Sequence, residues 1–472
     1  MQRLSALLVL QFLLLVPGMS IAQDLGHEVS LDTLHKYGLY DVDRLPPSFH
    51  ANRRKCVLDS MAPHSVAVLL STREKVRSND IDYEFHEDPN FYYLTGCLEP
   101  KSALILSKDP ISVAGHGVHE ILFVQQRDPK QETWTGKRLG PEGALAVLRP
   151  ESALPIDSLN DYLQRLLPHS DSLYYRPIGL KPESDPVYMS APNESMPSVE
   201  NPYKVITSTR LSKVLAELRE VKMPEELRLM RRAIAISNEA HNAVIRKARP
   251  GWYEYQIQGL AESIFTENGA EYTAYPCIVG SGPNSTILHY ETNRRQTQPG
   301  DFIEMDMGAE YHGYAADVTR SFPISGQFTP EQRTIYSLVL EAQDSGIQAC
   351  QAGAAFWAAH FAARRVIVRG LLRLGIIKDS NEYRQYFMHG TSHYLGLDVH
   401  DAGTGGPLRS GNVLTVEPGI YIPEGSPCDR KWWNIGCRIE DDILITPTGP
   451  EILSRNSPRT IPELERLMVR TR

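Results

Sequence analysis

Four carboxylates and one histidine in the C-terminal half constrain this chain more than any other feature: Asp306, Asp317, His393, Glu417 and Glu440. They lie in or beside apolar, strand-like sequence, so the fold must bring acidic side chains together in its interior. Burying several carboxylates in one place is costly unless cations compensate their charge. The sequence therefore predicts a fold that gathers these five side chains around two divalent cations.

The first two acids lie in a segment that predicts a hairpin. Residues 302 to 307 and 314 to 320 have the pattern of short strands, joined by a turn at residues 311 to 313. Folding about that turn places Asp306 opposite Asp317.

The two glutamates also have strand-like surroundings. The segment TVEPG predicts a strand that ends at a Pro-Gly turn, with Glu417 presented at the strand end. Farther along the chain, alternation on one predicted strand places Arg438, Glu440 and Asp442 on the same face. Arg438 is therefore expected to orient Glu440 from outside the ligand set.

Carboxylates combined with a single histidine favour Mn²⁺, with Co²⁺, Fe²⁺ or Zn²⁺ as alternatives. The sequence contains no paired CxxC motif and no HExxH motif. Thiolate-bound structural zinc and the zincin type of active site therefore have no support. Spacing alone does not choose the reaction.

The chain begins with a stretch typical of an export signal. Arg3 precedes an apolar run from Leu4 to Val16, Pro17 interrupts that run, and small residues at Ser20 and Ala22 form a cleavage-type site. We predict that residues 1–22 are a signal peptide and that the mature protein is exported, periplasmic or secreted. An uncleaved anchor is the alternative, but the run is shorter than the roughly 20 residues of a membrane span, and no later segment reaches that length.

The rest of the chain predicts two domains. Residues 23–215 alternate apolar runs such as VAVLLS, SALILS and EILFVQ with helical segments, the pattern of an α/β domain. Residues 216–472 begin with helical sequence that has Pro224 at a helix start, and they contain all five candidate ligands. The polar, Pro-rich residues 191 to 210 predict the connection between the domains. The expected fold class is α/β, or α+β.

Composition and spacing settle smaller points. The formal net charge of -8 gives no reason to expect a nucleic-acid partner. Trp357 and Phe361 lie four residues apart in an Ala-rich helical stretch and are expected to pack in the core.

Six cysteines are too few and too scattered for a disulfide scaffold. Cys428 and Cys437 bracket a loop between two candidate ligands and could form a bridge, with two free buried thiols as the alternative.

Three more histidines lie near the candidate ligands, at His289, His389 and His400. A lone histidine usually has a structural role. Neutral imidazoles near a metal centre, however, can bind a substrate carbonyl or stabilise a developing oxyanion. His389 and His393 have helical spacing, but Gly390 between them favours a loop or an irregular strand.

Motifs along nearly the whole mature chain resemble the aminopeptidase P and Xaa-Pro dipeptidase (prolidase) family of metallopeptidases. They are DPNFYYLTG and ETWTGKRLGPEGA in the first half, and EMDMGAEYHGYAADVTRSFP, FMHGTSHYLGLDVHD, LTVEPGIY and CRIEDDILIT in the second. The resemblance implies an N-terminal creatinase/aminopeptidase-P-like α/β domain. It also implies a C-terminal catalytic domain with the pita-bread fold that this family shares with creatinase and methionine aminopeptidase.

The resemblance also implies roles for individual residues. Asp306 would be a bidentate ligand of one metal, Asp317 and Glu440 would bridge both metals, and His393 and Glu417 would bind the other. Glu417 would also handle the proton of a bridging water. The remaining contacts would come from outer residues: His289, His389 and His400 at the substrate and transition state, Arg438 supporting the ligands, and Tyr421 as a weaker candidate that could equally be a packed aromatic.

The activity implied is hydrolysis of the bond between an N-terminal residue and a following proline, with a hydroxide bridging two metals as nucleophile. The expected partners are peptides with proline at the second position and further copies of the chain in a dimer or tetramer. Three alternatives remain: a dipeptidase restricted to Xaa-Pro, a metal-free creatinase-type amidinohydrolase, and a non-catalytic binding protein. The last two predict lost ligands, whereas this chain keeps all five.

Overall fold

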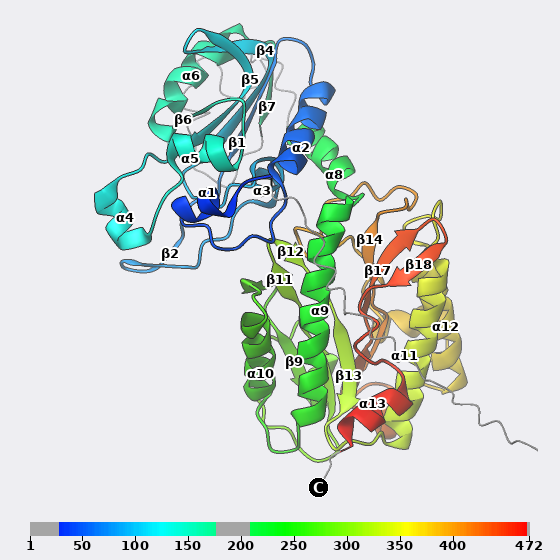
Figure 1. The fold of residues 1–472 in the computed structure, drawn as a ribbon. Helices are drawn as coiled ribbons and strands as arrows, with labels where there is room; N and C mark the ends of the chain where they lie inside the picture. The colour runs from blue at the N-terminus through cyan, green and yellow to red at the C-terminus, as the bar shows by residue number, and fades with distance from the viewer. Residues whose placement is uncertain (1–27, 176–207, 470–472) are drawn as a thin grey trace, which may run out of the picture.

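The computed structural model describes residues 28–175 and 208–469, which form two domains, with α8 (Ser208–Arg219) leading from the first into α9 (Pro224–Lys247) of the second (Figure 1). The predicted signal peptide and most of the predicted connection lie outside the described residues. Among the helices that are described, none is long and apolar enough to cross a membrane.

The N-terminal domain is built on one mixed sheet with strand order β6-β5-β4-β1-β7. β1 runs antiparallel to β4 and parallel to β7. The strands are β1 (Ser65–Leu70), β4 (Ala103–Val113), β5 (His116–Val124), β6 (Ala153–Pro155) and β7 (Ser172–Tyr175), with a separate pair β2 (Val76–Ser78) and β3 (Ile81–Asp82). The three apolar runs singled out in the sequence are therefore strands, as expected.

Alternation along these strands divides the apolar side chains between two cores. Val66 and Val68 pack with Leu163 of α6, whereas Ala67 and Leu69 face the larger core. This period of two follows from the strand pleat. The helices of this domain are α1 (Leu31–Lys36), α2 (Pro47–Ser60), α3 (Pro89–Thr95), α4 (Pro129–Thr135), α5 (Gly140–Val147) and α6 (Leu159–Leu166).

In the C-terminal domain, the strands lie between one pair of helices, α9 and α10, and a second pair, α11 and α12 (Figure 1). Pro224 begins α9 as predicted, because proline suits the first helical turn. The predicted domain boundary at residue 215 lies inside α8. The helices are α8 (Ser208–Arg219), α9 (Pro224–Lys247), α10 (Glu254–Glu267), α11 (Pro330–Ala349), α12 (Ala358–Arg373) and α13 (Ile461–Met468).

The strands of this domain are short and form several small sheets with orders β13-β10-β9, β12-β11-β8, β14-β17-β18 and β15-β16. Their bounds are β8 (Tyr272–Thr273), β9 (Ile278–Ser281), β10 (Phe302–Asp306), β11 (Ala309–Tyr311), β12 (Tyr314–Ala315), β13 (Thr319–Pro323), β14 (Val413–Val416), β15 (Gly419–Ile422), β16 (Ile435–Arg438), β17 (Asp441–Thr446) and β18 (Gly449–Ile452). Short 3₁₀ helices are η1 (Ile156–Ser158), η2 (Leu167–His169), η4 (Gly282–Thr286), η5 (Ser380–Gln385) and η6 (Arg430–Trp432).

Two expectations about this domain were wrong. Trp357 and Phe361 are not core residues, since they are 52% and 51% exposed at the start of α12. Their spacing placed them on one helical face, but that face points to solvent. The predicted strand through Arg438, Glu440 and Asp442 is also interrupted, because β16 ends at Arg438 and β17 begins at Asp441.

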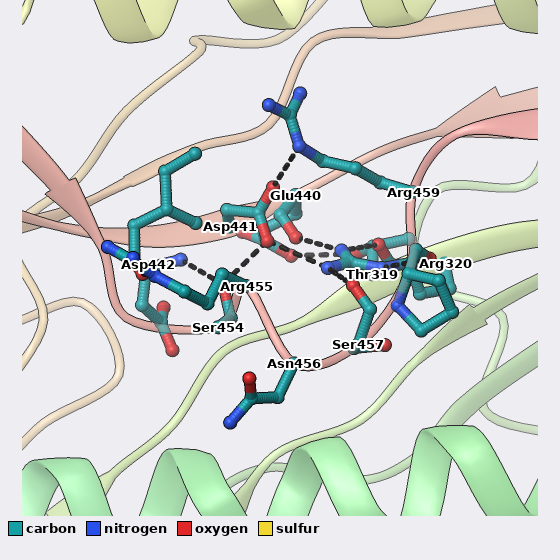
Figure 2. Close-up of polar contacts among 12 residues, drawn as sticks. Thr319, Arg320, Glu440, Asp441, Asp442, Ser454, Arg455, Asn456, Ser457 and Arg459 are labelled. Atoms are coloured by element: carbon teal, nitrogen blue, oxygen red, sulfur yellow. Dashed lines mark hydrogen bonds and ion pairs between the residues drawn. The ribbon is translucent and has the colours of Figure 1, made fainter. Parts of the chain in front are cut away.

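A buried arginine holds this interruption in place. Arg320 of β13 is fully buried, and its guanidinium donates hydrogen bonds to the Asp441 carboxylate at 2.7 Å and to the Glu440 carbonyl at 2.5 Å (Figure 2). It also donates to the carbonyls of Thr319, Ser457 and Pro458. Arg320 therefore ties the Glu440 carbonyl and the Asp441 side chain to β13.

Replacing Arg320 by Met should lower the free energy of unfolding by about 3 to 5 kcal/mol, because Asp441 would keep a buried charge without its main partner. Denaturant unfolding followed by circular dichroism measures the change. Arg455→Met is the matched control, since Arg455 is exposed and donates only to the Ile452 carbonyl. Equal stability of the two variants would contradict the role given to Arg320.

Candidate metal centre

Strand ends and one irregular segment bring the five candidate ligands to one cavity of about 740 Å³. Asp306 is the last residue of β10, and Glu417 follows β14 directly. Glu440 lies between β16 and β17. Asp317 and His393 lie in the loops that lead to β13 and β14. Glu417 thus occupies the predicted strand end before a Pro-Gly turn.

The predicted hairpin is present in outline. β10 and β13 pair antiparallel, with Asp306 opposite Thr319, and a smaller pair, β11 and β12, forms the tip. The two carboxylates face one another across a tyrosine. The Tyr275 hydroxyl lies 2.5 Å from Asp306 Oδ1 and 2.7 Å from Asp317 Oδ1.

The other candidate metal ligands lie close to these two carboxylates. His393 Nε2 lies 3.3 Å from Asp317 Oδ2 and 3.5 Å from Glu417 Oε1. Ligand atoms of Asp317, His393 and Glu440 all lie within 4.8 Å of one another. His393 Nδ1 faces the Tyr394 carbonyl at 3.0 Å, which leaves Nε2 for the cavity.

Arg438 is the main protein cation of the cavity, but its direct partner differs from the expected one. It contacts Asp306 Oδ2 at 2.7 Å and Glu304 Oε1 at 2.8 Å rather than the side chain of Glu440. It reaches Glu440 through Thr319, whose Oγ1 accepts from Arg438 at 3.1 Å and donates to Glu440 at 2.7 Å. The break between β16 and β17 explains the difference, since the two side chains do not share one strand face.

Burial and mutual repulsion disturb the protonation of these acids. Burial raises the pKa of Glu417 to about 7, with Asp317 and Asp306 adding to the rise and His393 opposing it. Burial, followed by repulsion from Asp317 and Glu417, raises the pKa of Glu440 well above its usual range. Burial would lower the pKa of His393, but the hydrogen bond to Asp317 and the charge of Glu417 raise it to about 9.

The donor set therefore fits divalent cations. Four carboxylates meet one imidazole and one guanidinium, so the protein's own positive charge does not balance the acids. Oxygen-rich sites with one histidine suit hard or borderline cations, which would replace protons on these groups.

A second set of possible metal ligands lies outside the cavity: Asp41, Glu271 and His312. There, each ring nitrogen of His312 faces a different carboxylate, as in a simple ion pair.

The three outer histidines all line the cavity. His400 packs its ring 4.2 Å from that of His393. Burial and then the nearby Arg438 lower the pKa of His389 to about 3, so its imidazole is neutral. His389 Nε2 lies 3.0 Å from the Tyr421 hydroxyl, which in turn accepts from Arg438 at 2.7 Å.

Tyr421 has features of both roles considered for it, a packed aromatic and a residue of the site. Its ring is fully buried, and its hydroxyl links Arg438 to His389. Tyr275 and Thr319 were missed by the sequence analysis. Nothing local distinguishes Tyr275 in AEYTAYPCIVGSG from an ordinary core aromatic, and its contact with the acids depends on the β10 and β13 pairing.

Cys428 and Cys437 are both free thiols in the structure. Cys437 is fully buried on β16, whereas Cys428 is only partly buried. The loop between them is therefore not closed by a disulfide, and none of its residues lines the cavity.

Comparisons with known proteins match both domains. Residues 50–174 match the model of the aminopeptidase P N-terminal domain, and residues 228–447 match that of metallopeptidase family M24. The Xaa-Pro aminopeptidase of Escherichia coli strain K12 is 39% identical, over 89% of this chain and 97% of its own length.

Solved structures show the same likeness. Aminopeptidase P from E. coli with the inhibitor Pro-Leu superposes with a TM-score of 0.83 at 38% identity, covering 90% of this chain and 98% of that one. The zinc-substituted E. coli enzyme in complex with product has a TM-score of 0.82 at 37% identity, with the same coverage. Two domain models in the expected order, and likeness over nine-tenths of the chain, lead to one conclusion: this chain is a metallopeptidase of family M24 with an aminopeptidase P N-terminal domain.

Proposed function

We propose that this chain is an Xaa-Pro aminopeptidase, which hydrolyses the bond between an N-terminal residue and a following proline. The observation that carries the proposal is the convergence of a complete donor set in one cavity, with all three outer histidines lining the same cavity. Relatives similar over almost their whole length are named Xaa-Pro aminopeptidase.

Two divalent cations, most simply Mn²⁺, would be held by the five donors: Asp306, Asp317, His393, Glu417 and Glu440. Such cations lower the pKa of a bound water from about 15.7 towards 7 and so supply a nucleophile at neutral pH. Support for Mn²⁺ comes from the carboxylate-rich donor set. The zinc-substituted relative indicates that other cations fit a site of this kind.

The proton transfer is assigned to Glu417 in this proposal. Its carboxylate faces the cavity beside His393, and its backbone N–H donates to the Thr391 carbonyl at 2.9 Å, which fixes its position. Glu417 would take a proton from the attacking water and deliver it to the leaving proline nitrogen. Protonation matters here because proline nitrogen carries no hydrogen before cleavage.

The outer residues would hold the substrate and its transition state. His289 and His400 lie at the cavity wall, where an imidazole can donate to the oxyanion that forms at the scissile carbonyl. His389 is fixed through Tyr421 by Arg438, so its neutral ring has a defined orientation. Arg438 thereby supports Asp306 and the substrate side of the cavity together.

We also propose that the protein is exported and works as a homodimer or homotetramer. The basic, apolar and small-residue order of residues 1–22 supports export. Resemblance to the aminopeptidase P family supports assembly.

Glu417→Gln should lower kcat by a factor of about 10² to 10⁴, because the amide keeps the shape but cannot accept the proton. Steady-state hydrolysis of Ala-Pro-Ala measures the loss. Glu291→Gln is the matched control, since Glu291 lines the same cavity and has no proposed role. A Glu417→Gln rate within a few fold of the parent would rule out the proton role.

A comparison of Ala-Pro with Ala-Pro-Ala as substrates, with and without divalent metal, tests the whole proposal. Activity on Ala-Pro-Ala should disappear in excess chelator and return with Mn²⁺, because the acids need cations to make the nucleophile. Cleavage of Ala-Pro alone would make the protein a dipeptidase. Full turnover in excess chelator would refute the two-metal mechanism.

A further inference from the structure

Exposed apolar side chains from two segments flank the cavity wall, and we term them the aromatic ledge: Trp357 and Phe361 at the start of α12, and Met388 next to His389. They are 52%, 51% and 49% exposed. Single exposed apolar residues are ordinary, but a cluster of them beside a site marks a binding surface. The mechanism proposed above uses none of the three.

The ledge is continuous with the cavity wall. Gly390 lines the cavity, and a Cβ added to it would lie 4.0 Å from the Trp357 ring. The His360 ring packs beside those of Trp357 and Phe361, with centroids 6.3 and 5.9 Å away. His360 Nδ1 also lies 3.0 Å from Thr391 Oγ1, in the segment that carries the cavity histidines.

The same ring contacts lead inward from the ledge. The His360 ring contacts Phe387 at 5.5 Å, and Phe387 contacts His389 edge-on at 5.2 Å. Phe387 is buried, so these contacts support His389 from behind. The exposed link between the ledge and the cavity is Gly390, which lies beside Trp357.

Another part of the cavity wall abuts the N-terminal domain. Asp398 lines the cavity and accepts from Arg219 at 2.7 Å, and Arg219 also donates to Asn90 of α3 at 2.8 Å. An aminopeptidase must confine the N-terminal residue and leave room for the rest of its substrate. The exposed ledge is the side that offers this room.

Positive charge beside the ledge complements the C-terminal carboxylate of a peptide. The Arg364 guanidinium lies 5.2 Å from the Phe361 ring and 5.8 Å from that of Tyr383, and Arg384 lies 6.0 Å from Tyr383. Both guanidinium groups lie on the Phe361 and Tyr383 side of the ledge. They can attract a C-terminal carboxylate.

We propose that the aromatic ledge binds the residues that follow proline, so that peptides longer than a tripeptide with an apolar or aromatic side chain there are preferred. The inference rests on the proposed function and extends it to substrate length. Trp357 and Phe361 provide stacking area, and Arg364 holds the carboxylate end.

The test compares Ala-Pro-Ala with Ala-Pro-Ala-Phe-Ala on the Mn²⁺-loaded full-length enzyme. The parent should have a kcat/KM about tenfold higher for the pentapeptide, through a lower KM. The double variant Trp357→Ala/Phe361→Ala should lose this preference and keep its rate on Ala-Pro-Ala within twofold. Leu372→Ala is the matched control, since Leu372 is 40% exposed at the other end of α12.

Other results of this experiment would overturn either the inference or the proposed function. Equal loss on both peptides would overturn the inference, because the ledge would then act only by supporting the segment near His389. Equal kcat/KM values for the parent would also overturn it. The inference would also be overturned if light scattering showed that the double variant dissociates into monomers, because the ledge would then be a contact between copies of the chain. Failure of the parent to cleave either peptide would instead refute the proposed function.

Discussion

Gathering four carboxylates in one cavity is the constraint on which the rest of the C-terminal domain depends. Arg438 pairs with Asp306 and Glu304, and His393 lies between Asp317 and Glu417, yet the pKa values of Glu417 and Glu440 remain raised. Unpaired carboxylates in a buried site favour protons or cations. The repulsion that makes this fold costly without metal is therefore also what makes it bind metal.

Strand ends supply the precision that the site needs. Four of the candidate ligands lie at or next to a strand end, and His393 lies beside β14, where its carbonyl accepts from the Thr415 N–H. Separate interactions hold these points together. Arg320 fixes the Glu440 backbone to β13, Thr319 links Glu440 to Arg438, and Tyr275 spans Asp306 and Asp317. Because these contacts come from neutral hydroxyls and from arginines outside the donor set, they can persist when the cations bind.

The sequence predicted the site better than its surroundings, for physical reasons. Buried acids in strand-like sequence have few explanations, so the five side chains that meet in the cavity and the strand end at Glu417 could be predicted. Alternating patterns predicted two domains, and the family resemblance added the type of each. The partner of Arg438 was mispredicted because a break between two strands leaves no local signal. Trp357 and Phe361 were misplaced because helical periodicity identifies a shared face without saying what covers it.

Crystals grown with Mn²⁺ and measured near the manganese absorption edge test the central claim most directly, since anomalous scattering locates each cation independently of activity. Two peaks should lie within the cavity, one beside Asp306 and one beside His393 and Glu417, with Asp317 and Glu440 between them. A single peak, or peaks only at Asp41, Glu271 and His312, would contradict the account.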